Sequence, residues 1–392
     1  MMRPMKLGGE QLLFGRGCLE HVKQIPCRRA AVVIGGSSLK KNGVLERVEA
    51  YIKESGAGKV LVEIGSGEPD MSMVRKGADV MKENQPDLIV ALGGGSVMDA
   101  AKAMWIFYEH EELGSLQDIM LPGRIEGLRG KAKMCCIPST SGTASEVSRS
   151  IVITDEQTGM KCGIGNMELV PDIAVCDPEV TVSVPPRLTA ETGMDALTHA
   201  VEALASTRAN YISDVLAMQA VKDIFRWLPA ACEDGGNLDA REALQNASMA
   251  AGLAFTNVSL GIVHSMSHAL GGYDKIPHGL ANAVLLPYIV RYNRENSGAG
   301  IVYERMEQEL GCGRLEEKIR ELNCRTGIPG TLREILPIPE QDFMEQLDGL
   351  AATALGDGCT KTNPVIPDRE TMKQLFCLAY GSSSCIPDEE TR

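Results

Sequence analysis

The sequence lacks three features that would indicate other classes of protein. No apolar stretch in its 392 residues is long enough to cross a bilayer, so no membrane partner is expected. Lysine and arginine form no long runs and the formal net charge is −13, which argues against nucleic acid and anionic membranes as partners. The twelve cysteines contain no C-x-x-C pair, and we expect most of them to be small buried residues in a reducing cell.

Size and composition predict a globular protein. At 42.1 kDa the chain is long enough for two domains, and 44% of its residues are hydrophobic, a fraction typical of folded rather than disordered proteins. Residues 1–6 lack the apolar segment of a secretory signal. We therefore expect a cytoplasmic protein.

The first half alternates short apolar segments with amphipathic ones. The strands that this pattern predicts span 30–35, 60–64, 87–92, 133–137 and 173–176, and the helices span 39–53, 71–84 and 96–108. Residues 149–161 resemble a hairpin that turns at Gly159. The order β-α-β-α-β favours a parallel sheet covered by helices, with the strand at 87–92 buried on both faces.

Strand signals disappear after residues 184–187, which contain two prolines, and helical periodicity continues to the end. We place a domain boundary there, which divides the chain into residues 1–184 and 185–392. The predicted helices of the second part span 186–206, 211–228, 240–255, 262–270, 278–292 and 301–310.

Two loops that each follow an apolar strand have the composition of ligand-binding turns. Gly93-Gly-Gly95 precedes a helix, so glycine backbone and free helical N–H groups could approach a phosphate, although the G-x-G-x-x-G spacing is absent. The second loop contains Ser139, Thr140 and Thr143, whose hydroxyls could donate to a phosphate or simply cap a helix. A tight turn that binds nothing is the alternative for the glycines.

The histidines are few but clustered. The chain has six, and His264, His268 and His278 fall within fifteen residues, the first two one helical turn apart. Asp195 and His199 have the same spacing on another predicted helix. A single histidine on an apolar face is usually a core residue, but one carboxylate with several imidazoles can hold Fe(II), Zn(II) or a similar ion.

These motifs together resemble the iron-containing alcohol dehydrogenases. The resemblance rests on the stretches 93–102, 138–147, 195–202 and 264–287, and it extends to 360–364. It implies an α/β, Rossmann-like dinucleotide-binding domain followed by an all-helical metal domain, the dehydroquinate synthase-like architecture, with the active site between them. It also implies Asp195, His199, His264 and His278 as metal ligands and His268 as a nearby catalytic histidine. The cofactor residues it implies are Gly94, Gly95, Ser96, Asp99, Ser139, Thr140, Thr143, Lys161 and Thr181.

The sequence departs from many NAD-using members just after the first predicted strand. Those members have an acidic residue there, whereas this chain has Gly36, Ser37 and Ser38, with Lys40 nearby. A carboxylate would repel a 2′-phosphate, and its absence leaves room and donors for one. We therefore expect NADP(H) to be accepted and mildly preferred, the alternative being that the loop has only lost a contact and NAD(H) still binds.

The resemblance implies reversible hydride transfer between NAD(P)(H) and a small alcohol or aldehyde, with the metal as Lewis acid. We expect specificity to depend on residues within 148–152, 255–260 and 359–362. The alternatives are a dehydroquinate synthase-like or glycerol dehydrogenase-like metal enzyme, a metal-dependent hydrolase, and a non-catalytic nucleotide sensor or filament subunit. A homodimer or higher homo-oligomer is expected.

Overall fold

A parallel sheet forms the framework of the N-terminal part. The computed structural model describes residues 4–65, 67, 69–121, 123–155, 161–271, 276–336 and 338–382. Six strands lie in the order β1-β8-β5-β4-β2-β3, and each neighbouring pair is parallel. Their bounds are β1 Gln11–Phe14, β2 Arg29–Ile34, β3 Gly58–Glu63, β4 Leu88–Gly93, β5 Lys133–Pro138 and β8 Ile173–Cys176.

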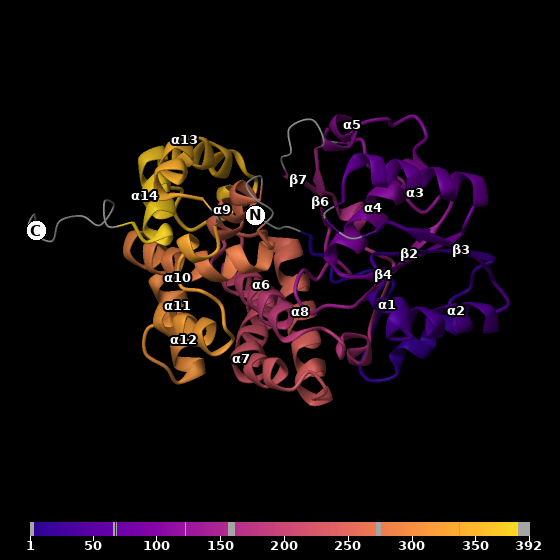
Figure 1. Ribbon diagram of the computed structural model, residues 1–392, viewed down its shortest axis with the longest axis horizontal. Coiled ribbons are helices and arrows are strands. Elements are labelled where there is room, and N and C mark those ends of the chain that lie inside the picture. Colours follow the sequence, from indigo (N-terminus) through magenta and orange to yellow (C-terminus); the bar gives the residue numbers. More distant parts are fainter. Residues whose placement is uncertain are drawn as a thin grey trace, which may run out of the picture.

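Helices cover both faces of this sheet (Figure 1). Alternate residues of each strand point to opposite faces, so Ala31 and Val33 of β2 join one apolar cluster while Ala30 and Val32 join another. Helices α3 (Met71–Asn84) and α4 (Gly95–Glu109) pack on the first face, and α1 (Ser38–Lys41) and α2 (Val44–Glu54) lie on the second. Every residue of β4 is buried, as its continuous apolar sequence predicts.

An antiparallel hairpin stands beside the sheet. Strands β6 (Ser150–Thr154) and β7 (Lys161–Gly165) form the antiparallel hairpin that the sequence predicts, although it extends to Gly165 rather than ending at Lys161, and the predicted turn at Gly159 lies outside the described residues. The shorter elements of this half are α5 (Leu116–Met120) and the 3-10 helices η1 (Cys18–Gln24), η2 (Met167–Leu169) and η3 (Pro178–Thr181).

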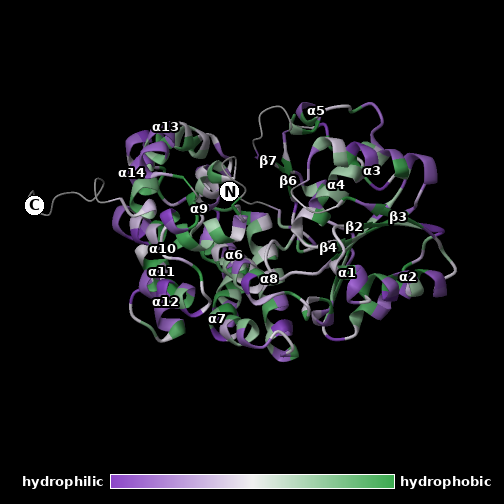
Figure 2. Ribbon diagram, viewed as in Figure 1, coloured by the Kyte–Doolittle hydropathy of each residue, from purple (hydrophilic) through white to green (hydrophobic). Residues whose placement is uncertain are grey.

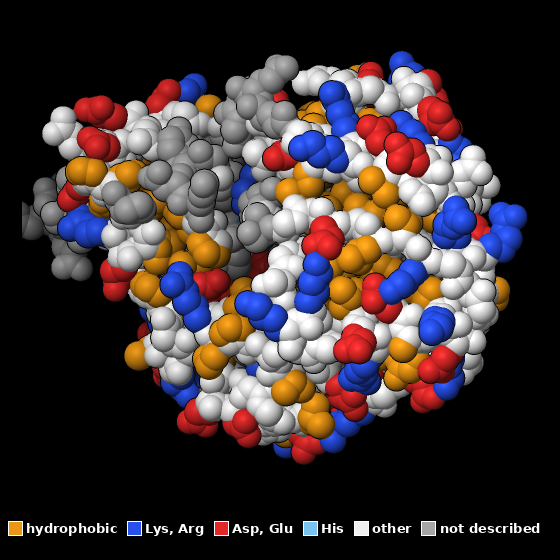
Figure 3. All heavy atoms as spheres, turned by 45° about the vertical axis from the view of Figure 1, so that its right-hand side comes forward, with side chains coloured by type: hydrophobic (Ala, Val, Ile, Leu, Met, Phe, Trp, Pro, Cys, Tyr) orange, Lys and Arg blue, Asp and Glu red, His pale blue; other side chains and the backbone are white. Residues whose placement is uncertain are grey.

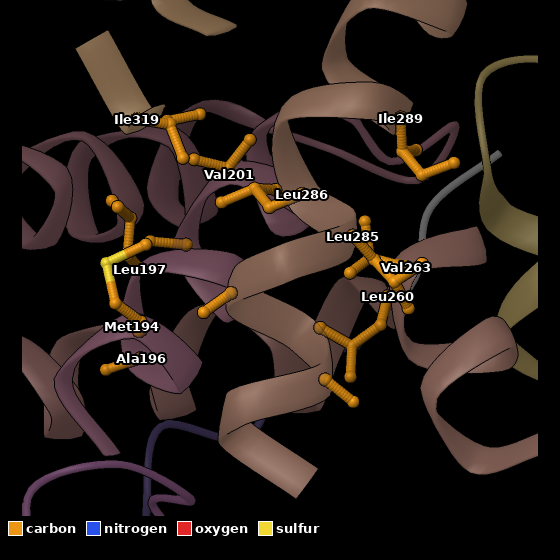
Figure 4. Packing of buried hydrophobic residues seen from close by; sticks show 14 of the residues in the cluster. Met194, Ala196, Leu197, Val201, Leu260, Val263, Leu285, Leu286, Ile289 and Ile319 are labelled. Carbon is orange, nitrogen blue, oxygen red and sulfur yellow. The ribbon is translucent and has the colours of Figure 1, made fainter. Parts of the chain in front are cut away.

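The described residues of the C-terminal part form helices joined by loops, with no strand among them. The α-helices are α6 Pro186–Ala205, α7 Tyr211–Glu233, α8 Leu238–Val258, α9 Ile262–Leu270, α10 His278–Asn296, α11 Gly300–Leu310, α12 Leu315–Arg325, α13 Glu340–Gly356 and α14 Arg369–Tyr380, and the 3-10 helices are η4 Leu332–Glu334 and η5 Cys359–Thr362. Figure 4 shows Leu197 and Val201 of α6 among apolar side chains that include Leu286 of α10 and Ile319 of α12. This packing fixes α6 and α10, the helices that carry most of the predicted metal ligands.

The structure corrects three details of the sequence-based assignment. The strand β1 was not predicted, because four residues give little periodicity, and it is held by parallel pairing with β8. The single helix predicted at 39–53 is two helices, separated at Asn42 and at Gly43, whose φ is +78°. Among the described cysteines only Cys135, Cys136, Cys176 and Cys377 are buried, so burial is less common than predicted.

Charge and hydropathy are distributed as the composition suggests. Polar and apolar residues alternate along outer helices such as α2 and α12 (Figure 2), and basic and acidic side chains are interspersed on the face shown in Figure 3. By length and apolar composition, none of the described helices would span a membrane singly; α8 and α9 would meet that test only jointly, across a 100° bend.

Candidate metal centre and cofactor cleft

The two ligand-binding loops predicted from the sequence meet at the carboxyl edge of the sheet. The strand order reverses between β2 and β4, and this is the position where open α/β sheets bind ligands. The loop after β5 lies against the turn after β4, since Ser139 N donates to Gly93 O at 2.8 Å. A Cβ atom on Gly94 would lie 3.4 Å from Thr140 Oγ1, and one on Gly95 would lie 2.5 Å from Thr143 Cγ2. The close approach of these loops therefore leaves no room for a side chain at Gly95.

The loop after β2 ends at the same edge. Gly36 has φ +35°, and Ser37 and Ser38 are exposed. Glu63, at the end of the neighbouring strand β3, pairs with Ile34 at the end of β2, and its Oε2 lies 2.6 Å from Lys40 Nζ. The segment thus presents hydroxyl and backbone donors beside an acid that is already paired.

Four other predicted cofactor residues occupy different environments. The Asp99 carboxylate accepts hydrogen bonds from Ser145 Oγ at 2.7 Å and from Val152 N at 2.9 Å, so it ties α4 to neighbouring segments as well as facing the cleft. The Lys161 side chain lies against Gly271, next to the histidine cluster. Ser96 is in the first turn of α4. The Thr181 hydroxyl instead donates to Pro178 O at 2.8 Å within its own 3-10 helix, and Thr181 does not line the cleft.

The four predicted metal ligands come together from three helices. Asp195 and His199 lie one turn apart on α6, His264 lies on α9, and His278 is the first residue of α10. A Cβ atom on Gly279 would lie 2.3 Å from a backbone oxygen of α6, so glycine lets the start of α10 approach that helix. Asp195 Oδ1 is 4.0 Å from His264 Nε2 and 3.7 Å from His278 Nε2, and the His199 and His264 rings stack with centroids 4.6 Å apart.

Two of the candidate ligands, His264 and His278, are oriented by hydrogen bonds to their outer nitrogens. These bonds determine which ring nitrogen faces the other candidate ligands. His264 Nδ1 lies 2.6 Å from Glu202 Oε2, and His278 Nδ1 lies 3.0 Å from Ser267 Oγ. With hydrogens on both Nδ1 atoms, the Nε2 lone pairs are directed inward, which is the arrangement that ligating histidines adopt. Burial lowers the pKa of His264 to about 3, so the neutral, metal-binding form is favoured.

The side-chain amide of Asn282 shows how strongly these acceptors converge. Its Nδ2 lies 2.7 Å from Asp195 Oδ1, 3.2 Å from His264 Nε2 and 3.1 Å from His278 Nε2. An NH₂ group has two hydrogens and cannot satisfy three acceptors, so the three acceptor atoms would suit a cation better. Ligand atoms about 2.1 Å from an ion would stand about 3.4 Å apart in a tetrahedron. That spacing is close to the separations of Asp195 Oδ1 from the Nε2 atoms of His264 and His278.

His199 completes the set. Its Nδ1 is buried and has no hydrogen-bond partner among the described residues. Burial lowers the pKa of His199 to about 4, which keeps the ring neutral and its lone pair available. One ligand atom each of Asp195, His199 and His264 lie within 4.8 Å of one another, so the residues present fit a divalent metal ion.

His268 is placed differently from the other three histidines of the cluster. Its ring stacks on that of His278, with centroids 5.2 Å apart, and its Nδ1 lies 2.9 Å from Asp357 Oδ2. Although burial alone would raise the pKa of Asp357, the hydrogen bond and charge of His268 lower it, so Asp357 is the acceptor. In the neutral form of the ring, His268 Nε2 is then the nitrogen with an unshared lone pair.

A cavity of about 300 Å³ joins these groups. Among the described residues that line it are Asp99 and Thr143 from the sheet edge and all four predicted ligands with His268. The segments predicted to set specificity also contribute, namely all of 148–152 together with Phe255, Ser259, Leu260 and Cys359. The cleft thus brings the sheet edge and helices α6, α9 and α10 to one space.

Comparison with known proteins agrees with this geometry along almost the whole chain. The profile of the iron-containing alcohol dehydrogenases matches residues 9–178, and that of the C-terminal part of the same family matches residues 189–380. The chain belongs to the iron-containing alcohol dehydrogenase family.

Individual members of the family are close in sequence and structure. The chain is 42% identical over 381 residues to an NADPH-dependent butanol dehydrogenase of Clostridium saccharobutylicum. The aligned region covers 95% of this chain and 97% of the relative. The iron-containing alcohol dehydrogenase of Thermococcus thioreducens superposes with a TM-score of 0.89 at 33% identity, covering 97% and 100% of the two chains. A 1,3-propanediol oxidoreductase superposes with a TM-score of 0.87 at 35% identity, covering 96% and 100%.

Membership in this family confirms the class of function predicted from the sequence. The protein is a metal-dependent oxidoreductase that acts on alcohols, and its family uses iron and NAD(P). The dehydroquinate synthase-like alternative is not favoured. The predicted fold, an N-terminal part built on a parallel sheet and a helical C-terminal part, is also confirmed.

Sequence reasoning missed the groups that support the ligands. Glu202 lies three residues after His199 on α6, and that spacing alone could have placed it on the face that carries the site. Asn282 follows His278 by one helical turn, which is a similar signal. Asp357, the partner of His268, follows the end of α13, and only the packing of α13 against α9 brings it into the cleft.

Proposed function

We propose that Asp195, His199, His264 and His278 hold the catalytic metal and that the enzyme interconverts short alcohols and aldehydes. The observation that carries this proposal is the convergence of Asp195 Oδ1 and two imidazole Nε2 atoms on one point of the cleft. When bound, the ion supplies a Lewis acid and the nicotinamide supplies or accepts hydride. The similarity to a butanol dehydrogenase supports unbranched C3 or C4 aldehydes as first substrates.

The protein's own groups orient the reaction and move the proton. Phe255 stacks on His199 with centroids 4.5 Å apart, and with Leu260 it gives the cleft an apolar wall that excludes water. His268 is held by Asp357 so that its Nε2 can exchange a proton with the alcohol oxygen, directly or through water. His268 is therefore the proposed proton-transfer residue.

We further propose that Gly36, Ser37 and Ser38 favour NADP(H) over NAD(H). No carboxylate stands on this segment, and the acid on the neighbouring strand, Glu63, is paired with Lys40. A 2′-phosphate would thus meet hydroxyl donors and a lysine rather than an uncompensated acid. The NADPH dependence of the butanol dehydrogenase relative supports this choice.

Metal analysis combined with kinetics tests the function. Purified protein is loaded separately with Fe(II) and Zn(II), its metal content is measured, and butanal and propanal are reduced with NADPH and NADH. We expect about one ion per chain, activity that a chelator abolishes and metal restores, and a higher kcat/KM with NADPH. Metal-independent turnover would contradict the ligand assignment. The cytoplasmic location, the homo-oligomeric state and the domain boundary at residue 184 stay predictions.

A further inference from the structure

Two arginines stand on the same cavity as the candidate ligands. Arg149 directly precedes β6, and Arg208 lies between α6 and α7. Both line the cleft together with Asp195, His199 and His264. Arg149 is half-buried, whereas Arg208 is exposed and stands at the mouth. One arginine thus comes from the segment that leads into the hairpin and the other from the helical part, and both reach the same cavity.

Neither guanidinium has a protein partner among the residues that the structure describes. Burial and the neighbouring Arg208 charge lower the pKa of Arg149, which shows that the two cations repel each other. A half-buried guanidinium without a hydrogen-bond acceptor is costly, and a second cation nearby adds to that cost. An anion that enters the cavity would relieve both.

The carboxylates of the cavity are engaged elsewhere. Asp99 accepts hydrogen bonds from Ser145 Oγ and Val152 N. Asp357 accepts from His268 Nδ1 and, at 2.7 Å, from the backbone N of Cys359. Asp195 belongs to the ligand set. The negative groups that could neutralise the arginines therefore already have partners.

The phosphates of the cofactor are the other anion to consider. Of the residues on the loops predicted to hold them, Thr143 lines this cavity, whereas Gly94, Gly95, Ser96, Ser139 and Thr140 are not among the described residues that line it. Arg149 shares the cavity with the histidine cluster instead. The arginines thus face the space for the substrate.

Resting on the proposed function, we propose that the physiological substrate is a short aldehyde, or the corresponding alcohol, with a terminal carboxylate that Arg149 and Arg208 bind. A guanidinium offers paired N–H donors that match a carboxylate, which fixes the far end of the substrate while its carbonyl lies at the histidine cluster. In the reduction, hydride from the nicotinamide C4 forms the new C–H bond, and the carbonyl π pair moves to oxygen, which takes up a proton. The carboxylate is unchanged.

The test compares substrates that differ only in charge. Metal-loaded enzyme reduces succinic semialdehyde, its neutral methyl ester and butanal with NADPH. We expect the wild-type kcat/KM to be at least about 10-fold higher for the carboxylate than for the ester, since a charge-assisted hydrogen bond contributes roughly that factor. Arg149→Met is expected to lower the carboxylate-to-ester ratio about 10- to 100-fold, and Arg208→Met less, because solvent screens an exposed charge.

Controls separate a binding role from structural damage. Arg314→Met, at an exposed arginine just before α12, should keep the wild-type ratio. Arg149→Lys should have a higher carboxylate-to-ester ratio of kcat/KM than Arg149→Met. Damage to the fold would instead lower the activity with the carboxylate and with the ester in proportion. If Arg149→Met does not fold, wild-type enzyme is tested at increasing salt. The KM for the carboxylate must rise as the salt concentration is raised to about 0.3 M, while the KM for the ester stays the same.

The outcomes distinguish the two proposals. If none of the three aldehydes is reduced by metal-loaded enzyme with either cofactor, the proposed function fails. If butanal and the ester are reduced but the carboxylate is no better, and Arg149→Met leaves the ratio unchanged, only the assignment of an anionic substrate is overturned.

Discussion

Replacing Glu202 with glutamine should weaken metal binding without removing a ligand. Glu202 Oε2 accepts from His264 Nδ1 at 2.6 Å, and Oε1 accepts from Val263 N at 2.7 Å. Both contacts require an acceptor. A glutamine amide has one oxygen and one NH₂ group, so its NH₂ must face either Val263 N or His264 Nδ1, which are themselves donors. If the NH₂ faces His264, the ring loses the acceptor that holds its hydrogen on Nδ1 and its lone pair on Nε2.

The expected size follows from that single contact. A hydrogen bond between an imidazole and a buried carboxylate contributes about 1.5 to 3 kcal/mol, which corresponds to about 10- to 100-fold in the metal Kd, the range typical for partners of ligating histidines. Competition with a chromophoric chelator measures the Kd for Zn(II) in wild type and Glu202→Gln. The number of ions bound at saturation should stay the same.

A matched control is available on the loop after β5. Glu146 is also a buried carboxylate, and burial raises the pKa of Glu146 and of Glu202 alike, to about 7. Among the described residues, however, Glu146 has no hydrogen bond to a candidate ligand. Glu146→Gln should therefore leave the metal Kd near its wild-type value. A Kd for Glu202→Gln within about twofold of wild type would refute the role assigned to Glu202.

Three further predictions follow from the same structure. His268→Gln should lower kcat about 10²- to 10⁴-fold with metal content retained, as metal assay and steady-state kinetics would show; loss of metal would instead make His268 a ligand. Ser37→Asp should shift the NADPH-to-NADH ratio of kcat/KM toward NADH about 10-fold or more, because a carboxylate repels the 2′-phosphate, and an unchanged ratio would place that phosphate elsewhere. The raised pKa of Glu146 contributes stability that is present below the usual carboxyl pKa of 4.5 and is lost as the pH rises through about 7. Between pH 5 and 8, wild type should therefore lose about 3 kcal/mol more stability than Glu146→Gln, and parallel urea-unfolding profiles of the metal-free proteins would contradict this.

The sequence by itself determined the elements and most of the candidate site. Continuous apolar segments identified β2, β4, β5 and β8, because strands buried on both faces need no polar residues. The spacing of Asp195 and His199, like that of His264 and His268, placed each pair on one helical face, since residues four apart are neighbours on any α-helix. The apolar segments and the four-residue spacings are properties of neighbouring residues in the chain, so they can be recognised in the sequence alone.

Only the tertiary structure decided which groups from distant segments meet. Asp357 reaches His268 because α13 packs against α9, and Asn282 reaches Asp195 because α10 packs closely on α6. The strand β1 exists because β8 offers it an edge to pair with. The position of Arg149 and Arg208 on one cavity depends in the same way on how the sheet domain meets the helices. Such contacts between remote residues arise from packing, and no periodicity in the chain encodes them.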